Sequence, residues 1–241
     1  MRSPAGEGKT QADPRTLGPP QKRVEIVPDV FDSLLVVAPH PDDEVIAAGG
    51  LIHRMRALGR RVRVVVVSDG RASHPSSRLY RPDALAALRR SESLAALASL
   101  GVGRESIHFC DFPDGQSAHW ESMSGPLARL AGAVFGTFDL VCLPSAEDNH
   151  ADHRKTRDLA RRFLAGSGLT LSYTVWPSED RPPSDRTPAV HRMDRATRAA
   201  KAAALRLYKT QVDGLPDAPD GFTIDAPTFR RFTAPVESFT L

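Results

Sequence analysis

Four side chains that can bind a metal ion or transfer a proton lie within five positions, directly after an apolar segment. The sequence reads LLVVAPHPDDE, so His40, Asp42, Asp43 and Glu44 follow a run of buried-type residues. Crowded carboxylates repel one another, and a bound cation offsets that repulsion. We therefore expect a metal site at the end of a buried strand.

A second group of such side chains lies further along the chain, in the segment SAEDNHADH, which contains His150, Asp152 and His153. Imidazole and carboxylate groups without a nearby cysteine suit zinc or a similar divalent ion. A catalytic zinc has three protein ligands and one open position for water. His40 and Asp43, three residues apart at the entry of a helix, would supply two ligands, and either His153 or His150 would supply the third.

Strand and helix patterns alternate along the chain, and this alternation positions the two groups. Continuous apolar runs predict buried strands at 34–38, 62–68, 106–112, 138–145 and 169–176. Amphipathic patterns predict helices at 44–58, 83–100, 124–136, 152–165 and 195–209. The alternation predicts an α/β fold, Rossmann-like, with a mostly parallel sheet covered by helices on both faces. The two polar loops then meet at the carboxyl ends of the strands, where sites form in such sheets.

The chain has 241 residues, enough for one sizeable core. Residues 1–28 are polar and rich in proline, which predicts a flexible N-terminal arm before a single domain at 29–241. The segment 177–194, rich in proline and charge, is predicted to form a loop or flap. The tail from 213 is predicted to be irregular, with a late edge strand.

Composition argues against several classes of partner. The formal net charge is +3, and the basic residues are scattered, which disfavours nucleic-acid binding. No apolar run approaches the roughly 20 residues that cross a bilayer, and the N-terminus has no apolar signal-peptide core. Cys110 and Cys142 lie in apolar runs without a CxxC motif and are predicted to be buried free thiols. We expect a cytoplasmic protein without stable membrane insertion, and the sequence predicts no particular oligomeric state.

The two motifs together resemble those of the LmbE-like or PIG-L family of metal-dependent N-deacetylases. The resemblance rests on the strand followed by HPDDE and on the later HADH, and it extends over most of 34–210. Three further segments resemble family elements: LRRSESLAALASLGV at 88–102, PDG at 113–115 and KAAALRLYKTQ at 201–211. The last segment departs from the family pattern, with Tyr208 where the family usually has His and Thr210 where it has Ser.

The resemblance implies a role for each residue of the two motifs. His40, Asp43 and His153 are then the ligands of one Zn²⁺ ion per chain, or of Fe²⁺ or another divalent ion. Asp42 is the general base, and His150 faces the reacting carbonyl.

Three more residues are expected near the site. Asp152 is expected to orient one of the two histidines of the second motif. Arg89 is expected to bind the substrate, with pairing to Glu92 or Ser93 on a solvated helix face as the alternative. Asp114 is also expected to bind the substrate, with a purely structural role in the Pro-Asp-Gly turn as the alternative.

The function implied is that of a zinc-dependent hydrolase with a small-molecule substrate. It would remove an N-acetyl or other N-acyl group from an amino sugar or a GlcNAc-type conjugate, using a metal-activated water. A metallophosphoesterase is the first alternative, because DNHAD weakly resembles a GNH motif, but that class requires more ligands for two metal ions. The second alternative is a catalytically degenerate sugar-binding protein of the same fold, and the five intact motif positions argue against it.

Overall fold

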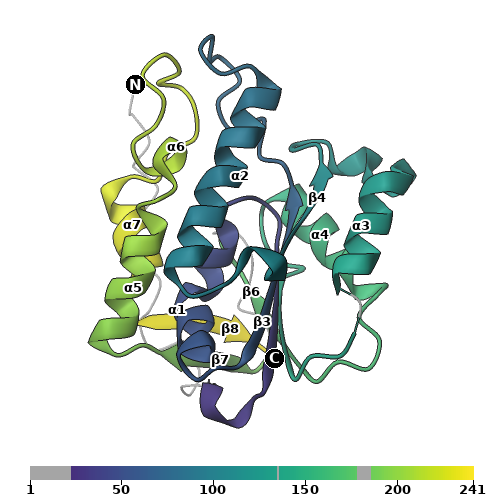
Figure 1. The fold of residues 1–241 in the computed structure, drawn as a ribbon, viewed down its shortest axis with the longest axis vertical. Coiled ribbons are helices and arrows are strands. Elements are labelled where there is room, and N and C mark those ends of the chain that lie inside the picture. The colour runs from purple at the N-terminus through teal and green to yellow at the C-terminus, as the bar shows by residue number, and fades with distance from the viewer. Residues whose placement is uncertain (1–22, 135, 178–185) are drawn as a thin grey trace, which may run out of the picture.

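The fold is described by a computed structural model that covers residues 23–134, 136–177 and 186–241 (Figure 1). Most of the expected arm at 1–28, and residues 178–185 of the expected flap, lie outside the described residues. The division into an arm and one domain at 29–241 stays a prediction. No helix among the described residues is long and apolar enough to cross a membrane.

A sheet of eight strands forms the centre of the described chain, in the order β1-β7-β8-β6-β5-β2-β3-β4. The strands are β1 (Val24–Glu25), β2 (Ser33–Ala38), β3 (Arg61–Ser68), β4 (Ile107–Phe112), β5 (Leu140–Pro144), β6 (Leu169–Tyr173), β7 (Pro188–Arg192) and β8 (Val236–Thr240). Neighbouring strands run parallel, except that β8 is antiparallel to both β6 and β7. The predicted mostly parallel α/β sheet is therefore confirmed. Cys110 and Cys142 are buried free thiols within it, as expected.

Helices cover both faces of the sheet, which explains why its central strands β2 and β5 are buried along their whole length. Their bounds are α1 (Asp43–Ala57), α2 (Pro82–Ser99), α3 (Ser124–Val134), α4 (Ala151–Arg161), α5 (Arg195–Leu205), α6 (Lys209–Val212) and α7 (Ala226–Phe232). In Figure 1, α1, α2 and α5 lie on one side of the strands, and α3 and α4 lie on the other. Alternate residues of β2 enter the two cores: Leu34 and Val36 pack on the α1 side, and Leu35 and Val37 on the α4 side.

The C-terminal region differs from its prediction. Residues 188–192, expected in a loop, form β7, and the tail expected to be irregular forms α7 and β8. β8 lies inside the sheet, between β6 and β7, and is not an edge strand. At the other terminus, Val24–Glu25 of the expected arm pairs with β7, and Ile26 is buried. These strands are short and partly polar, so they form through pairing with remote segments and leave no apolar run in the sequence.

Helix α1 is interrupted near its middle, and residues from α5 and β8 bind the backbone groups that the interruption leaves without helical hydrogen bonds. Ala48 has non-helical dihedral angles (φ −138°, ψ 19°). The carboxylate of Glu237 accepts a hydrogen bond from the freed backbone N–H of Gly50 at 2.7 Å. Lys201 donates to the carbonyl of Ile46 at 2.8 Å and to Glu237 at 2.7 Å. A buried ion pair from α5 and β8 therefore satisfies the backbone groups that the break exposes.

Candidate metal centre and active site

The two polar motifs meet because their strands are neighbours. β2 and β5 pair in parallel, so the loops after them leave the sheet at the same edge. Asp43 begins α1 after the first loop, and His153 lies in the first turn of α4 after the second. The expected convergence of the two loops is confirmed.

The turn after β2 holds Asp42 in a strained backbone conformation. Its φ is 137°, a value that disfavours any residue with a side chain and costs about 1–3 kcal/mol. Two contacts hold the turn in place. The N–H of Asp42 donates to Oε2 of Glu44 at 3.0 Å, and the guanidinium of Arg89 donates to the carbonyl of Pro41 at 2.7 Å. Strain held in this way is characteristic of functional sites.

Three buried side chains converge beside this turn. Oδ2 of Asp43 lies 3.2 Å from Nδ1 of His40 and 3.2 Å from Nε2 of His153. The three side chains can offer ligand atoms that all lie within 4.8 Å of one another. Burial raises the pKa of Asp43, but the two imidazoles outweigh it and hold the pKa well below its usual range. We call His40, Asp43 and His153 the metal-type trio.

A carboxylate stands behind each histidine of the trio. Oδ2 of Asp148 lies 3.1 Å from Nδ1 of His153. Behind His40, Oδ1 of Asp114 lies 3.1 Å and Oδ2 of Asp152 lies 3.4 Å from Nε2. Carboxylates in such positions fix the tautomer of an imidazole and leave its other nitrogen free to bind a metal ion.

The donor set of the trio fits a divalent cation. Within the described part of the chain, Nε2 of His40 and both ring nitrogens of His153 are buried without a hydrogen bond of good geometry. Burial lowers the pKa of His153, but Asp43 and Asp148 raise it to about 9. Buried nitrogens facing carboxylates, with an excess of acidic groups around them, are what a cation would complete.

His150 lies next to the trio, but one nitrogen of its ring caps a helix. Its ring centroid is 4.8 Å from that of His40 and 4.9 Å from that of His153. Its Nδ1 caps α4 by accepting the N–H of Asp152 at 3.2 Å. Burial and the two positive imidazoles lower the pKa of His150. In this arrangement the ring is neutral and its proton sits on Nε2, as a hydrogen-bond donor.

Asp42 lines the cavity beside the trio. Burial raises its pKa to about 8, against the opposing effect of the Arg89 guanidinium, whose Nη2 lies 3.3 Å away. A carboxyl group with a pKa near neutrality can both accept and return a proton under physiological conditions.

Arg89 and Asp114 both line the cavity. Arg89 is only 3% exposed, so its alternative as part of a solvated helix face is wrong. It donates to the carbonyls of Gly70 (3.0 Å) and Pro41 (2.7 Å) and so joins the loops after β3 and β2. Asp114 accepts the N–H of Ala72 at 3.1 Å and faces His40 with its other oxygen.

Asp152 contacts a different histidine from those predicted. It was expected to orient a histidine of its own motif, but its carboxylate faces His40 and accepts the N–H of Gly115 at 2.8 Å. Asp148, to which the sequence assigned no role, faces His153 instead. The available signal was its position two residues before His150, where an Asp side chain often accepts the N–H of residue i+2, as it does here at 3.0 Å.

Tyr208, the departure from the family pattern, lies beneath the site and not in the cavity. Its hydroxyl donates to Oε1 of Glu44 at 2.6 Å, and Ser93 donates to the same oxygen. Glu44 is fully buried and holds the N–H of Asp42 with its other oxygen. Tyr208 therefore supports the strained turn from below.

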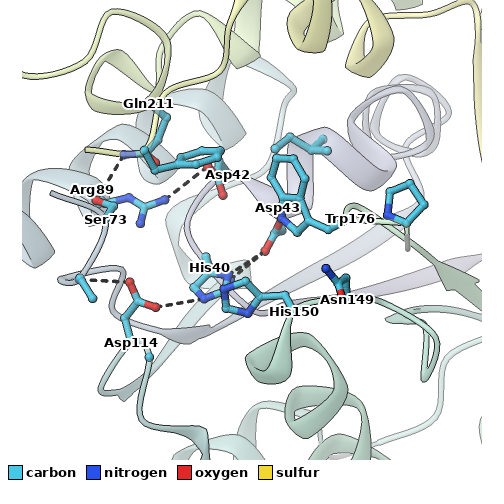
Figure 2. Close-up of a pocket in the computed structure, with 15 residues that line it drawn as sticks. His40, Asp42, Asp43, Ser73, Arg89, Asp114, Asn149, His150, Trp176 and Gln211 are labelled. Atoms are coloured by element: carbon cyan, nitrogen blue, oxygen red, sulfur yellow. Dashed lines mark hydrogen bonds and ion pairs between the residues drawn. The ribbon is translucent and has the colours of Figure 1, made fainter. Parts of the chain in front are cut away.

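The site opens into a cavity of about 630 Å³ (Figure 2). Its lining is polar around the trio, and it becomes apolar toward Trp176 and Phe222. The lining residues are His40, Asp42, Asp43, Ile46, Ala72, Ser73, Arg89, Asp114, Gly115, Asn149, His150, Trp176, Pro177, Gln211 and Phe222.

Comparison with known proteins agrees with this geometry. The family model described as PIG-L: GlcNAc-PI de-N-acetylase matches residues 35–164, more than half of the chain. A 1D-myo-inositol 2-acetamido-2-deoxy-alpha-D-glucopyranoside deacetylase of Mycobacterium sp. (strain JLS) is 36% identical over 248 residues, covering 80% of this chain and 78% of that protein.

Solved structures share the fold at lower sequence identity. A triple mutant of a deacetylase of the teicoplanin biosynthetic pathway has a TM-score of 0.61 at 21% identity, covering 86% of this chain and 97% of that chain. The 4-carboxy-2-hydroxymuconate hydratase GalB of Pseudomonas putida KT2440 has a TM-score of 0.52 at 22% identity, covering 73% and 78%. The fold by itself thus accompanies more than one reaction. On the evidence of the family match and the mycobacterial relative, the chain belongs to the PIG-L (LmbE-like) family of N-deacetylases.

Proposed function

We propose that this protein is a metal-dependent hydrolase that removes an N-acetyl or other N-acyl group from an amino sugar or a GlcNAc-type conjugate. The observation that carries the proposal is the buried trio of His40, Asp43 and His153, two of which line the cavity together with Asp42. The deacetylase activity named for the mycobacterial relative supports it.

The trio would hold one zinc ion, and Fe²⁺ shares the same ligand preferences. Two nitrogens and one carboxylate oxygen match the ligand set of a catalytic zinc that keeps an open position. When bound there, the ion supplies Lewis-acid chemistry, lowering the pKa of water and polarising the amide carbonyl. Asp148 orients His153, and Asp114 with Asp152 orients His40.

Asp42 is the general base in this proposal. It takes a proton from the attacking water and passes it to the leaving amine as the C–N bond breaks. Its raised pKa suits both steps. The contacts from Arg89 and Glu44 keep the carboxyl group in one position, so no reorganisation is needed before the reaction.

His150 stabilises the negative charge that develops on the carbonyl oxygen. Because its Nδ1 accepts the N–H of Asp152, its Nε2–H is available as a donor. A neutral donor held in place contributes to such stabilisation without first having to be protonated. Asp114 and Arg89 are assigned to the sugar side of the cavity, with Asp114 accepting a substrate hydroxyl and Arg89 maintaining the loops that surround it.

The alternatives are less well supported. A metallophosphoesterase needs ligands for two ions, and the second group of possible ligands in the described chain, His40, His150 and Asp152, shares His40 with the first. A degenerate sugar-binding protein remains an outcome of the activity test.

The test is amine release from a panel of N-acetylhexosamine conjugates by the zinc-loaded protein. The panel spans free GlcNAc, GlcNAc-inositol, chitobiose and aryl or nucleotide GlcNAc, with Asp42→Ala as the blank. Asp111→Ala is the matched control, because Asp111 is the other non-glycine residue of the described chain with a positive φ and lies outside the cavity. Release above the blank is expected for at least one conjugate. No release from any member, by metal-loaded protein, would favour the sugar-binding alternative.

A further inference from the structure

One side of the cavity is an aromatic surface that the proposed chemistry does not use. Trp176, Pro177, Phe222 and Ile46 line it, and we call these four residues the apolar wall. The Trp176 ring stands edge-on to Phe222, with centroids 5.6 Å apart and an interplanar angle of 85°. Phe222 is 37% exposed, so the wall presents apolar surface to the open cavity.

The wall is held rigidly by backbone hydrogen bonds. The N–H of Trp176 donates to the carboxylate of Asp148 at 3.2 Å, and its carbonyl accepts the N–H of Asn149 at 2.8 Å. The N–H of Phe222 donates to the carbonyl of Ser73 at 2.8 Å. Asp148 therefore places both the wall and His153, and the apolar surface has a defined position relative to the metal-type trio.

Trp176 and Asp114 lie on opposite sides of the trio. Asp114 follows β4, Trp176 follows β6, and β2, which leads to His40, lies between these strands in the sheet. Figure 2 shows the same order, with Asp114 on one side of His40 and His150, and Trp176 and Asn149 on the other.

We propose that the apolar wall binds the acyl chain of the substrate and that the enzyme prefers N-acyl groups longer than acetyl. The inference rests on the proposed function. A scissile amide has an amine side and an acyl side, and with the sugar at Asp114 the acyl carbon points across the trio toward Trp176. An acetyl methyl group covers little of this surface, whereas a longer chain removes the wall from water. The reaction remains hydrolysis: the C–N bond breaks, the water oxygen bonds to the acyl carbon, and the amine takes a proton.

The first experiment varies only the acyl chain on glucosamine, from acetyl through butanoyl and hexanoyl to octanoyl. Full burial of one methylene is worth about fourfold in affinity. Since the wall stays partly open, kcat/KM is expected to rise about tenfold or more from acetyl to hexanoyl. In Trp176→Ala and Phe222→Ala the ratio of hexanoyl to acetyl activity is expected to fall toward one. Because Phe222 is partly exposed, its truncation leaves a folded variant if Trp176→Ala proves unstable.

A binding measurement provides a readout without turnover. N-methanesulfonyl and N-hexanesulfonyl glucosamine are non-hydrolysable analogues that differ only in chain length, and calorimetry gives their affinities. The hexanesulfonyl compound is expected to bind about tenfold more tightly and to change the fluorescence of Trp176. The only other tryptophan, Trp120, is fully buried. Leu79→Ala removes an exposed leucine outside the cavity and serves as the control.

The outcomes separate this inference from the proposed function. Hydrolysis of N-acetylglucosamine compounds with no dependence on chain length would overturn the acyl-chain assignment alone. The assignment would also be wrong if Trp176→Ala selectively reduced activity on aryl glycosides of GlcNAc, because the wall would then bind the aglycone. Chain-length-dependent binding of the sulfonamides without hydrolysis of any amide would overturn the proposed function and retain the acyl site.

Discussion

Two buried groups of charged residues in this protein are built in opposite ways. At the break in α1, Lys201 and Glu237 are almost fully buried, and each contacts the other and the backbone of the helix. Beside the cavity, Nε2 of His40 and both ring nitrogens of His153 are buried without good hydrogen bonds, while several carboxylates crowd around them. The first group is complete without any ligand, whereas the second has an arrangement that a bound cation would balance.

The comparison shows how a structural group can be told from a functional one. In both, burial makes the charges expensive to leave unpaired. At the break in α1 the protein itself supplies all partners, so the pair contributes to folding. Beside the cavity, imidazoles and carboxylates converge on one point. Asp42, whose backbone conformation is strained, lies next to them. The predictions below test this distinction.

The largest effect is expected for His153→Ala. Without this imidazole the trio loses a ligand, so the protein should lose bound metal and, with it, turnover. Metal content after gel filtration and amine release measure the two losses. His191→Ala is the control, since His191 is also buried but lies outside the metal-type trio. Full metal occupancy in His153→Ala would make His150 the third ligand.

Asp42→Ala should retain metal and lose turnover by about 10²–10⁴-fold, the usual contribution of a general base. Asp42 is not part of the trio, which explains why metal binding should survive. Amine release and metal content are measured on the same sample, with Asp111→Ala alongside. Activity close to that of the unaltered protein would exclude Asp42 as the base.

Glu237→Ala should affect stability and leave the metal centre alone. It leaves the buried Lys201 ammonium without a counter-ion and the N–H of Gly50 without an acceptor, which costs about 3–5 kcal/mol in the free energy of unfolding. Urea unfolding measures the loss, and metal content per folded chain is expected to stay unchanged. Glu237→Gln keeps an acceptor for Gly50 and should lose less. Equal losses in both variants would show that the charge alone matters.

Asp148→Asn should weaken metal binding about 10–100-fold while the protein stays folded. The amide cannot hold His153 as the carboxylate does, and it also alters the support of Trp176. Competition with a chelator measures the affinity. Asp217→Asn is matched to it, because Asp217 accepts two backbone N–H groups in an exposed loop. Unchanged affinity in Asp148→Asn would remove Asp148 from the metal centre.

The smallest effect compares two substitutions at one position. Asp42→Gly should be about 1 kcal/mol more stable than Asp42→Ala, because glycine adopts a φ of 137° without strain and alanine does not. Both variants lack the carboxylate, so they should be equally inactive. Thermal unfolding measures the difference, and identical stabilities would show that the turn relaxes when the side chain is removed.

The sequence by itself determined the fold class and most of the residues that lie together at the candidate site. Strands buried on both faces require continuous apolar runs, so β2 to β6 could be predicted from local pattern alone. The order of strand and helix then brought HPDDE and HADH to one edge of the sheet, because parallel strands place their carboxyl ends together. The residues of the metal-type trio, Asp42 and His150 were therefore predicted together, and the structure places all of them close to one another.

Only the tertiary structure decided which groups contact one another across long separations. That the carboxylate of Asp152 faces His40, in a remote segment of the chain, depends on how the two loops pack, and the sequence of neither loop indicates it. The burial of Arg89 depends in the same way on the arrangement of neighbouring elements. β8 is part of the sheet although its sequence, VESFT, is partly polar. Its backbone pairs with β6 and β7, and its Glu237 accepts a backbone N–H at the interruption in α1. The local sequence pattern indicates which residues a segment buries, and only the tertiary structure shows which other segment it packs against.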